Sequence, residues 1–569
     1  MFNSKQTNLF SHNKKESTSE NSFINASLKE SSKIINPQGS VKLKTTNNDF
    51  VDQFGNATNY KKPRTYKEIN NDMTILWSQN KLLTLCFVFY LRMITRVVSL
   101  FNGAKTKQSQ RGQGLKHEGI FRMLWIYNNA PDTFWKNITL FISIGSWKDI
   151  ITMLSYDLQY NGWKNKVLDW DKFGKLILAG LENPNTSELL KKYLPQIKSN
   201  NSCKTLEAQA DNIIAKWICS LLFGGKIQED NYKNYRSYRK LKSSGTAHEW
   251  QQLISKKEMF KIDFNTIHGR ALSQLVSSNF LKNQGLEKKY EEWISSKPVA
   301  KYTGYVYELF SILGTDKSDN SSKLKQYQKD TINKQFLQLV EIGKNGMKKG
   351  INGLIVTIDS SSSMNALVPG TKVSAYSVAK SMALYFSYLL EGYFNNYFLE
   401  FSSDTDLKQW KGDTPINKFV NEKSDIVGNT DFLSIATHFG KILKQGIKES
   451  EFPTGILCVS DGCFNGNNKK SQSSNFKALL SGLENYGFSK DFVSNFKVVL
   501  WDIPNNYYGS TQTSFEEFAN CPNLYHISGL DPAGIAFLTG IEGQVNVPKN
   551  SEELFLAAMN QEVLNKLEI

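Results

Sequence analysis

The sequence predicts a multidomain protein in which an α-helical repeat region is followed by an α/β domain of the doubly wound, Rossmann-like class. The chain has 569 residues, which is too many for a single hydrophobic core. Apolar residues recur every three or four positions between residues 70 and 345, as expected for amphipathic helices. After Gly353, short β-rich runs alternate with helical stretches, a pattern typical of a parallel sheet covered by helices on both faces.

The chain divides into three segments on composition and pattern. Residues 1–68 are rich in Asn, Ser, Lys and Thr and have few regularly spaced apolar positions. Such a segment cannot bury enough apolar surface to offset the entropy lost on ordering, so we expect a disordered polar and basic tail. We assign residues 69–345 to the helical domain and residues 350–569 to the α/β domain with a C-terminal helix.

The helical domain contains several clear amphipathic segments. Residues 121–158 predict two or three helices with turns at Pro131 and Gly145, and residues 211–223 predict another. Short helices in series are typical of stacked helical hairpins, as in HEAT-like repeats.

The α/β domain shows a regular order of strands and helices. Helices are expected at residues 372–394 and 432–447. Strands are expected at residues 353–359, 397–403, 454–462, 496–503 and 524–529. In a doubly wound sheet, ligands bind outside the carboxyl ends of the strands, so residues that follow strands are the first candidates for a site.

The sequence indicates a soluble, cytoplasmic protein. The first residues are polar and show no secretory signal. The most apolar stretch, residues 82–101, carries Arg92 and Arg96, so we expect a buried helix there and no membrane span. The six cysteines form no CxxC pair and no framework spacing, which favours a reducing compartment.

Charge is distributed unevenly between the two parts of the chain. Residues 351–569 contain 16 Lys, no Arg and 23 Asp and Glu, a net charge of −7. The first 350 residues contain 53 basic and 30 acidic side chains, a net charge of +23. This asymmetry suggests that the helical half meets a polyanion, and nucleic acid is the natural candidate. A Lys-rich solvated surface is the alternative, and the composition alone leaves it open.

Two predicted strands end in the same manner. Asp359 closes the run at residues 353–359, and Asp461 closes the run at residues 454–462 in the segment Ser460-Asp461-Gly462. Ser361 and Ser363 stand beside the first of these carboxylates, and Thr430 lies on a loop that enters a helix. Hard divalent cations prefer oxygen ligands of this kind. The pattern therefore predicts a metal site at the carboxyl edge of the sheet, with a solvated turn as the alternative.

This pattern resembles the metal-ion-dependent adhesion site of von Willebrand factor A domains. The resemblance covers residues 350 to about 545, and it implies that Asp359, Ser361, Ser363, Thr430 and Asp461 hold the metal directly or through water. The implied cation is Mg²⁺, or another divalent cation such as Mn²⁺ or Ca²⁺. Many members of the family have Gly where Ser362 stands, which is a departure in the geometry of the loop.

The helical half resembles Ro-type proteins, which contain a TROVE module. The likeness is carried by residues 111–154, with a Gly/Arg-rich start, paired helices and a G-x-W-x-D turn, and by residues 215–220 and 235–271. It is closest to an uncharacterised Ro-like family of eukaryotes, viruses and phages. The resemblance implies a ring of helical repeats that binds structured small RNA or single-stranded RNA ends. It also implies a C-terminal von Willebrand A domain that clasps the two ends of the ring.

Two basic segments are candidates for RNA contacts on residue chemistry alone. The first is a Gly-containing loop before a helix, with Lys105, Lys107, Arg111 and Lys116. The second, residues 235–242, interleaves Tyr235 and Tyr238 with four cations, Arg236, Arg239, Lys240 and Lys242. Each of these segments could equally be a solvated helix face whose aromatic side chains belong to the core.

Two classes of function remain open. The first is a Ro-like RNA-binding protein whose metal site recruits a protein partner through a carboxylate. The second is a scaffold, cellular or viral, that does not bind RNA and uses the metal site for protein–protein contact. No catalytic triad, P-loop or dinucleotide-binding motif is present, and we expect no enzyme activity.

Overall fold

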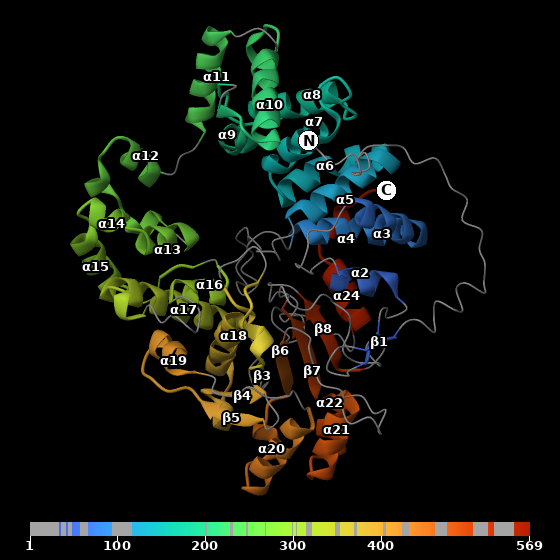
Figure 1. Ribbon diagram of the computed structural model, residues 1–569, viewed down its shortest axis with the longest axis vertical. Coiled ribbons are helices and arrows are strands. Elements are labelled where there is room, and N and C mark those ends of the chain that lie inside the picture. The colour runs from blue at the N-terminus through green and yellow to red at the C-terminus, as the bar shows by residue number, and fades with distance from the viewer. Residues whose placement is uncertain are drawn as a thin grey trace.

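The structure is a computed structural model of the protein and describes most of the chain (Figure 1). Within the described residues, a long α-helical region is followed by an α/β region with a six-stranded sheet. The described residues are 33–35, 41–43, 48–56, 66–93, 116–199, 202–227, 231–245, 249–267, 269–298, 300–302, 304–313, 321–346, 353–368, 373–401, 405–423, 432–460, 475–503, 522–528 and 551–569.

The helices that precede the sheet follow one another along an arc (Figure 1). Helices that are neighbours in the sequence pack side by side, as α5 with α6, α8 with α9 and α10 with α11 do, which agrees with the predicted stacking of helical hairpins. These helices are α2 (Asp49–Asn56), α3 (Tyr66–Gln79), α4 (Lys81–Met93), α5 (Lys116–Asn129), α6 (Pro131–Ile144), α7 (Trp147–Asn161), α8 (Trp170–Glu182), α9 (Pro184–Tyr193), α10 (Leu206–Phe223), α11 (Tyr232–Ser244), α12 (Glu249–Ser255), α13 (Gly269–Ser277), α14 (Phe280–Asn283), α15 (Glu287–Ser295), α16 (Val306–Phe310) and α17 (Gln326–Gly346).

Local sequence explains the predicted turns of the helical region. Pro131 is the first residue of α6, where a backbone N–H would have no partner within the helix. The Ser146 amide, just before α7, donates to Asp149 Oδ2 at 2.9 Å and so starts that helix. A Cβ atom at residue 145 would lie 2.2 Å from Asp149 Oδ2, which explains the glycine there. The G-x-W-x-D turn is therefore a helix start.

Helix α4 forms part of the apolar stretch that was predicted to be a buried helix. Most of its residues are buried, including Arg92. The Arg92 guanidinium donates to both carboxylate oxygens of the buried Asp149, from Nε at 2.8 Å and from Nη2 at 3.0 Å. In the described part of the chain, no helix is long and apolar enough to cross a membrane.

Residues 1–68 were predicted to be a disordered tail, and the structure differs from this at two places. A short antiparallel hairpin pairs β1 (Lys33–Ile35) with β2 (Val41–Leu43), and α2 follows it. Phe50 and Val51 of α2 are buried, and the Phe50 ring packs at a tilt against Phe555 from the far end of the chain. A local sequence pattern cannot predict α2, because the surface that covers it lies about five hundred residues away.

The α/β region contains the predicted strands and one more. The sheet has the order β5-β4-β3-β6-β7-β8, and all neighbouring pairs are parallel except β4 with β5. The extra strand, β5, is a short edge strand whose residues are half-buried or exposed, so it lacks the apolar run that identified the others. The strands are β3 (Leu354–Asp359), β4 (Tyr397–Phe401), β5 (Asp406–Gln409), β6 (Gly455–Ser460), β7 (Lys497–Asp502) and β8 (Leu524–Ser528).

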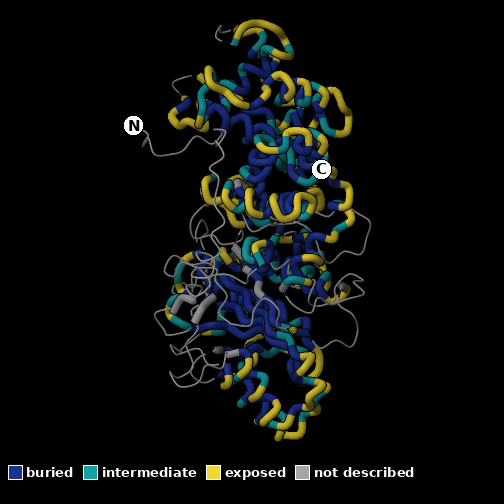
Figure 2. Tube along the Cα trace, turned by 90° about the vertical axis from the view of Figure 1, so that its right-hand side faces the viewer, coloured by how far each residue is buried: buried dark blue, intermediate teal, exposed yellow. Residues whose placement is uncertain are grey.

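Helices cover both faces of this sheet (Figure 1), whose strands form the buried layer seen in Figure 2. Residues of α16, α17, α18 and α19 share a hydrophobic core with one face, while residues of α20, α21 and α22 share a core with the other. This arrangement is the predicted doubly wound architecture. The helices after α17 are α18 (Ala375–Leu389), α19 (Pro415–Asn421), α20 (Phe432–Lys444), α21 (Asn475–Asn485), α22 (Lys490–Asn495) and α24 (Ser551–Met559).

The α/β region contacts both ends of the helical arc. At one end, α16 and α17 pack against α18. At the other end, the C-terminal clasp, which we define as residues 551–569 with α24 and the 3-10 turn η9 (Leu564–Lys566), packs against α2 and α4. Asn137 of α6 donates to the Glu568 carbonyl at 2.6 Å and accepts from the Glu568 amide at 3.0 Å. These contacts agree with the expected closure of the helical region at both ends.

Candidate metal centre and basic surface

The carboxyl ends of β3 and β6 lie side by side in the middle of the sheet. Strand β3 pairs with β4 on one side and β6 on the other, so the strand order reverses at β3. A doubly wound sheet opens a crevice at such a switch point, because the connections on the two sides run to opposite faces. Any side chains that follow β3 and β6 therefore lie at the place where this architecture binds ligands.

Four oxygen-bearing side chains gather at this edge. Asp359 has an exposed fraction of 0%. Its Oδ2 accepts a hydrogen bond from Ser460 Oγ at 2.6 Å, and its Oδ1 accepts one from the Ser361 amide at 2.9 Å. The hydroxyl oxygens of Ser361 and Ser363, both half-buried, lie 3.0 Å apart. The structure thus brings together three of the five predicted metal ligands, Asp359, Ser361 and Ser363.

The other two predicted ligands, Thr430 and Asp461, lie outside the described residues. Among the residues that the structure describes, no group of three or more His, Cys, Asp and Glu could hold a metal ion. The proposed set is of another kind, because it depends on serine hydroxyls together with two Asp residues. A buried carboxylate with adjacent hydroxyls has the donor chemistry that Mg²⁺ accepts alongside water. The described donors fit a hard divalent cation.

Two residues at this edge were not predicted as part of the site. Ser460 ends β6 next to Asp359, and Asp502 is paired with Ser460 in the register of β6 and β7. Asp502 is buried and adds a second described carboxylate to the same edge. Both residues close apolar runs in the sequence, and that position is the signal that could have identified them.

The local field at this edge is negative. Burial raises the pKa of the Cys458 thiol well above its usual range, and the charge of Asp359 raises it further. Cys458 stands opposite Thr357 of β3, two residues before Asp359. Of these two causes, the charge of Asp359 is the one that would attract a cation to this edge.

The loop after Asp359 accommodates Ser362 at the position where many von Willebrand A domains have Gly. Ser362 is exposed and begins the 3-10 turn η6 (Ser362–Asn365). Its φ is not positive; the described non-glycine residues with positive φ are Lys257, Asn396 and Asn523. Serine therefore occupies this loop without left-handed backbone strain.

The second basic segment forms helix α11, and the structure separates its two faces. Tyr235 and Tyr238 are buried, and the Tyr238 hydroxyl donates to the Pro195 carbonyl at 3.0 Å. The two rings belong to the core of the helical arc, as the alternative interpretation of this segment expected. Arg236, Arg239 and Lys240 are exposed and remain candidates for RNA contacts.

Lys242, also predicted as an RNA contact, has a structural role. Its ammonium donates to the Lys192 carbonyl at 3.2 Å and to the Leu194 carbonyl, at the C-terminal end of α9. Such carbonyls have no partner within their own helix, and a lysine can satisfy them. Burial lowers the pKa of Lys242, as expected for a cation drawn away from water.

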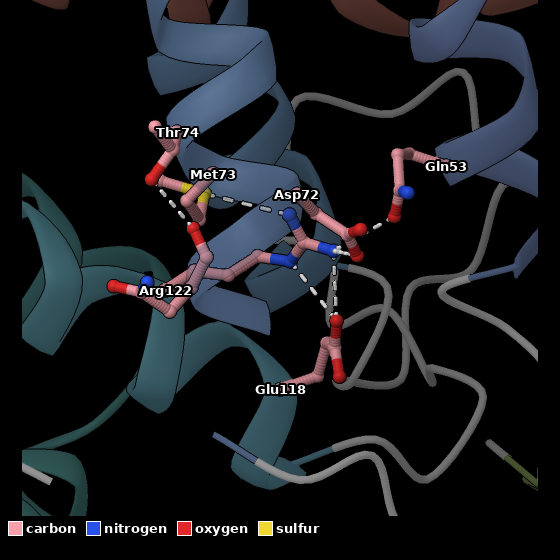
Figure 3. Close-up of polar contacts among 7 residues, drawn as sticks. Gln53, Asp72, Met73, Thr74, Glu118 and Arg122 are labelled. Carbon is pink, nitrogen blue, oxygen red and sulfur yellow. Dashed lines mark hydrogen bonds and ion pairs between the residues drawn. The ribbon is translucent and has the colours of Figure 1, made fainter. Parts of the chain in front are cut away.

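The first basic segment is only partly described. Lys105, Lys107 and Arg111 lie outside the described residues, and of Lys116 only the backbone, at the start of α5, is described. The Ro-like stretch at residues 111–154 also contains Arg122, which is fully buried. Its role in RNA binding is excluded by that burial, and Figure 3 shows its surroundings.

Arg122 connects its own helix, α5, with α2, α3 and α4. Its guanidinium donates to Glu118 of α5 at 3.0 Å from Nε and to Gln53 of α2 at 3.4 Å from Nη2 (Figure 3). It also lies 3.8 Å from Asp72 of α3 and stacks over the Phe87 ring at 5.2 Å from the centroid. A buried cation with two carboxylates and a ring face is well compensated, so this part of the motif stabilises the fold.

Comparisons with known proteins add little to the sequence and the geometry of the site. No family model matches the chain, and no curated protein matches it. Among solved structures, it is similar to the crystal structure of the Deinococcus radiodurans Ro (RSR) protein, with a TM-score of 0.31 and 10% sequence identity. The match covers 86% of this chain and 90% of that chain. A similarity this low assigns neither fold nor function.

Proposed function

We propose that this chain is a Ro-like RNA-binding protein with a divalent metal site that recruits a protein partner. In this proposal the basic helical half binds structured or single-stranded RNA. The α/β half binds Mg²⁺, or another divalent cation such as Mn²⁺ or Ca²⁺. The observation that carries the proposal is the oxygen cluster of Asp359, Ser361 and Ser363 at the switch point of the sheet.

The metal would be held by Asp359, Ser361 and Ser363, together with Thr430 and Asp461. When bound, the cation supplies an electrophilic position that a partner's carboxylate can occupy. The chain's own contribution is orientation: the Ser460 hydroxyl and the Ser361 amide each hold one oxygen of the Asp359 carboxylate. We propose that this site binds a partner and does not catalyse a reaction.

Calorimetric titration of the full chain with Mg²⁺ and with Mn²⁺ tests the metal site. We expect saturable binding, which Asp359→Asn abolishes and Asp413→Asn, a matched change of an exposed carboxylate in the same half, leaves intact. A cation at a hundred times its Kd should also stabilise the fold by about 2.7 kcal/mol. Equal binding by the wild type and Asp359→Asn would show that the cluster is not the site.

Support for RNA binding comes from charge and from the exposed face of α11. The first 350 residues carry the net charge of +23, and Arg236, Arg239 and Lys240 are exposed on a helix without acidic residues. Each neutralised phosphate on a single strand releases counterion and contributes about −0.7 to the slope of log K against log salt. Replacing these three residues with Ala should therefore flatten the slope by about two units if all three contact phosphate.

The matched control for this test replaces three exposed lysines of the acidic half, Lys441, Lys448 and Lys490, with Ala. Its net charge changes equally, but its salt slope should match that of the wild type. Crosslinking and sequencing of RNA from cells would identify the bound species. If no RNA is recovered and a protein is captured through the metal edge, the scaffold function is favoured instead.

The two ligands should use separate surfaces, because the oxygen cluster lies at the sheet edge and the candidate cations lie on α11 in the helical arc. Asp359→Ala should then abolish recruitment of the partner and leave RNA affinity nearly unchanged. Loss of RNA binding in a folded Asp359→Ala protein would mean that metal and RNA share one site.

A further inference from the structure

We infer that the exposed face of α11 binds unpaired nucleotides of RNA, with a base stacked on the ring of Tyr232. Arg236, Arg239 and Lys240 would contact the phosphates on either side of that base. This inference rests on the proposed RNA-binding function. It assigns the unpaired part of the RNA to α11 and adds a residue that stacks on a base.

The phase of the helix places the ring and the cations on one face. At 100° per residue, Tyr232, Arg236, Arg239 and Lys240 lie within about 100° of one another. All four are exposed, whereas Tyr235, which borders this face, is buried in the core. The sequence of α11 contains no Asp or Glu, so no carboxylate of this helix competes for the cations.

Tyr232 is held in position although it is 75% exposed. Its ring meets the edge of the Tyr235 ring, with centroids 6.2 Å apart and planes at 72°. The adjoining helix start is fixed by Asn231, whose Oδ1 accepts from the Asn234 amide at 3.1 Å. Asn234 Nδ2 in turn donates to the carbonyls of Phe223 at 3.1 Å and Gly224 at 2.9 Å, at the end of α10. The ring is therefore exposed to solvent at a helix start that several hydrogen bonds hold in place.

A ring beside a row of cations fits a single strand better than a duplex. In an A-form duplex each base face is covered by its neighbours, so an aromatic side chain has no face to stack on. An unpaired nucleotide offers both a base face for the ring and a phosphate for a guanidinium. From Tyr232 to Lys240 the helix rises about 12 Å, which is long enough for its cations to contact more than one phosphate of a strand.

The test compares two RNA probes and four variants of the full chain. The probes are a short oligouridine and a strand of equal length whose central nucleotides are abasic, so that both present the same phosphates. The variants are Tyr232→Ala, Tyr232→Phe, Arg236→Ala and the control Phe260→Ala, which removes another exposed ring, 66% exposed, from a different part of the arc. Each is measured across a range of salt concentrations.

We expect Tyr232→Ala to weaken oligouridine binding by about five- to a hundredfold, the range found for loss of one stacked base. The salt slope should stay unchanged, because a neutral ring releases no counterion. Tyr232→Phe and Phe260→Ala should bind like the wild type, and the abasic strand should not distinguish Tyr232→Ala from the wild type. Arg236→Ala should instead reduce the salt slope by about 0.7 on both probes.

Three results would overturn the inference. If Tyr232→Ala binds oligouridine as the wild type does while Arg236→Ala weakens binding, α11 contacts phosphates only, and the proposed RNA-binding function survives without base stacking. If Tyr232→Ala weakens both probes equally, the ring acts on the helix and not on a base. If the wild type binds neither probe nor any cellular RNA, the proposed function itself fails.

Discussion

Phe555 connects the C-terminal clasp to the helical arc, and its removal should open the clasp. The side chain is 1% exposed. Its ring contacts Phe50 and Phe54 of α2 and Phe87 of α4, at centroid distances of 5.7, 5.5 and 5.9 Å. Phe555→Ala would leave these three rings facing a void.

The expected size of the effect follows from this burial. Truncation of a fully buried Phe to Ala destabilises by about 3–5 kcal/mol, the loss of burial and the residual cavity together. The clasp also places Met559, Leu564 and Leu567 in the same core, and its polar links, such as Asn48 to Glu552 at 3.2 Å, are worth about 0.5–1.5 kcal/mol each. Opening of the clasp should therefore become more frequent by about a hundredfold to a few thousandfold.

Amide hydrogen exchange measures that opening directly. In Phe555→Ala, amides of α24 and α2 should exchange faster by this factor, while those of the sheet strands should be unchanged. Leu556→Ala is the matched control, because the neighbouring side chain on the same helix is 45% exposed and should be removable without effect. Faster exchange in α24 with no change in α2 would refute the idea that the two helices open together. Unchanged exchange in both would refute the assigned role of Phe555.

Two further substitutions separate stabilising residues from binding residues. Asp149→Ala should lower the free energy of unfolding by about 3–5 kcal/mol in urea denaturation, since it leaves the buried Arg92 unpaired, and Arg92→Met in the same chain should recover part of that loss. No recovery in the double variant would show that the turn at Ser146, and not the ion pair, dominates. Lys242→Met should destabilise by about 1.5–3 kcal/mol through the two carbonyls it leaves at the end of α9, without changing the salt dependence of RNA binding. If Lys242→Met instead flattens the slope of log K for RNA binding against log salt, this lysine contacts RNA after all.

Much of the fold could be predicted from the sequence where the signal is local. Pro131 and Gly145 mark helix boundaries because their backbone requirements depend on nearby residues only. The runs that end at Asp359 and Ser460 are identifiable as central strands because parallel strands buried on both faces are apolar throughout. The position of the first carboxylate and its serines then follows from the architecture.

The parts that could not be predicted depend on partners far away in the sequence. Asp502 joins the candidate site only through the pairing of β7 with β6, and strand order cannot be read from composition. The spacing of Tyr235 and Tyr238 is compatible with an exposed RNA-binding face and with a buried core face. Periodicity shows that residues share a helix face, but it does not show whether that face is covered by other helices. The contact of α11 with α9 and α10 decides that question, and it leaves Tyr232 outside.

The hydrophobic cores do not follow the boundary that composition suggests near residue 350. Phe555 and Leu564 belong to the same core as the helices from α2 to α11, and Phe310 and Phe336 of the helical arc belong to the core of the sheet. The chain thus exchanges a segment across the boundary in each direction, so each half completes the core of the other. A fragment cut at residue 350 would expose Phe50, Phe54 and Phe87 on one piece and leave the α18 face of the sheet without α16 and α17 on the other. The contacts that close the arc therefore stabilise both halves. Entry of RNA into the arc would require the same apolar contacts to open.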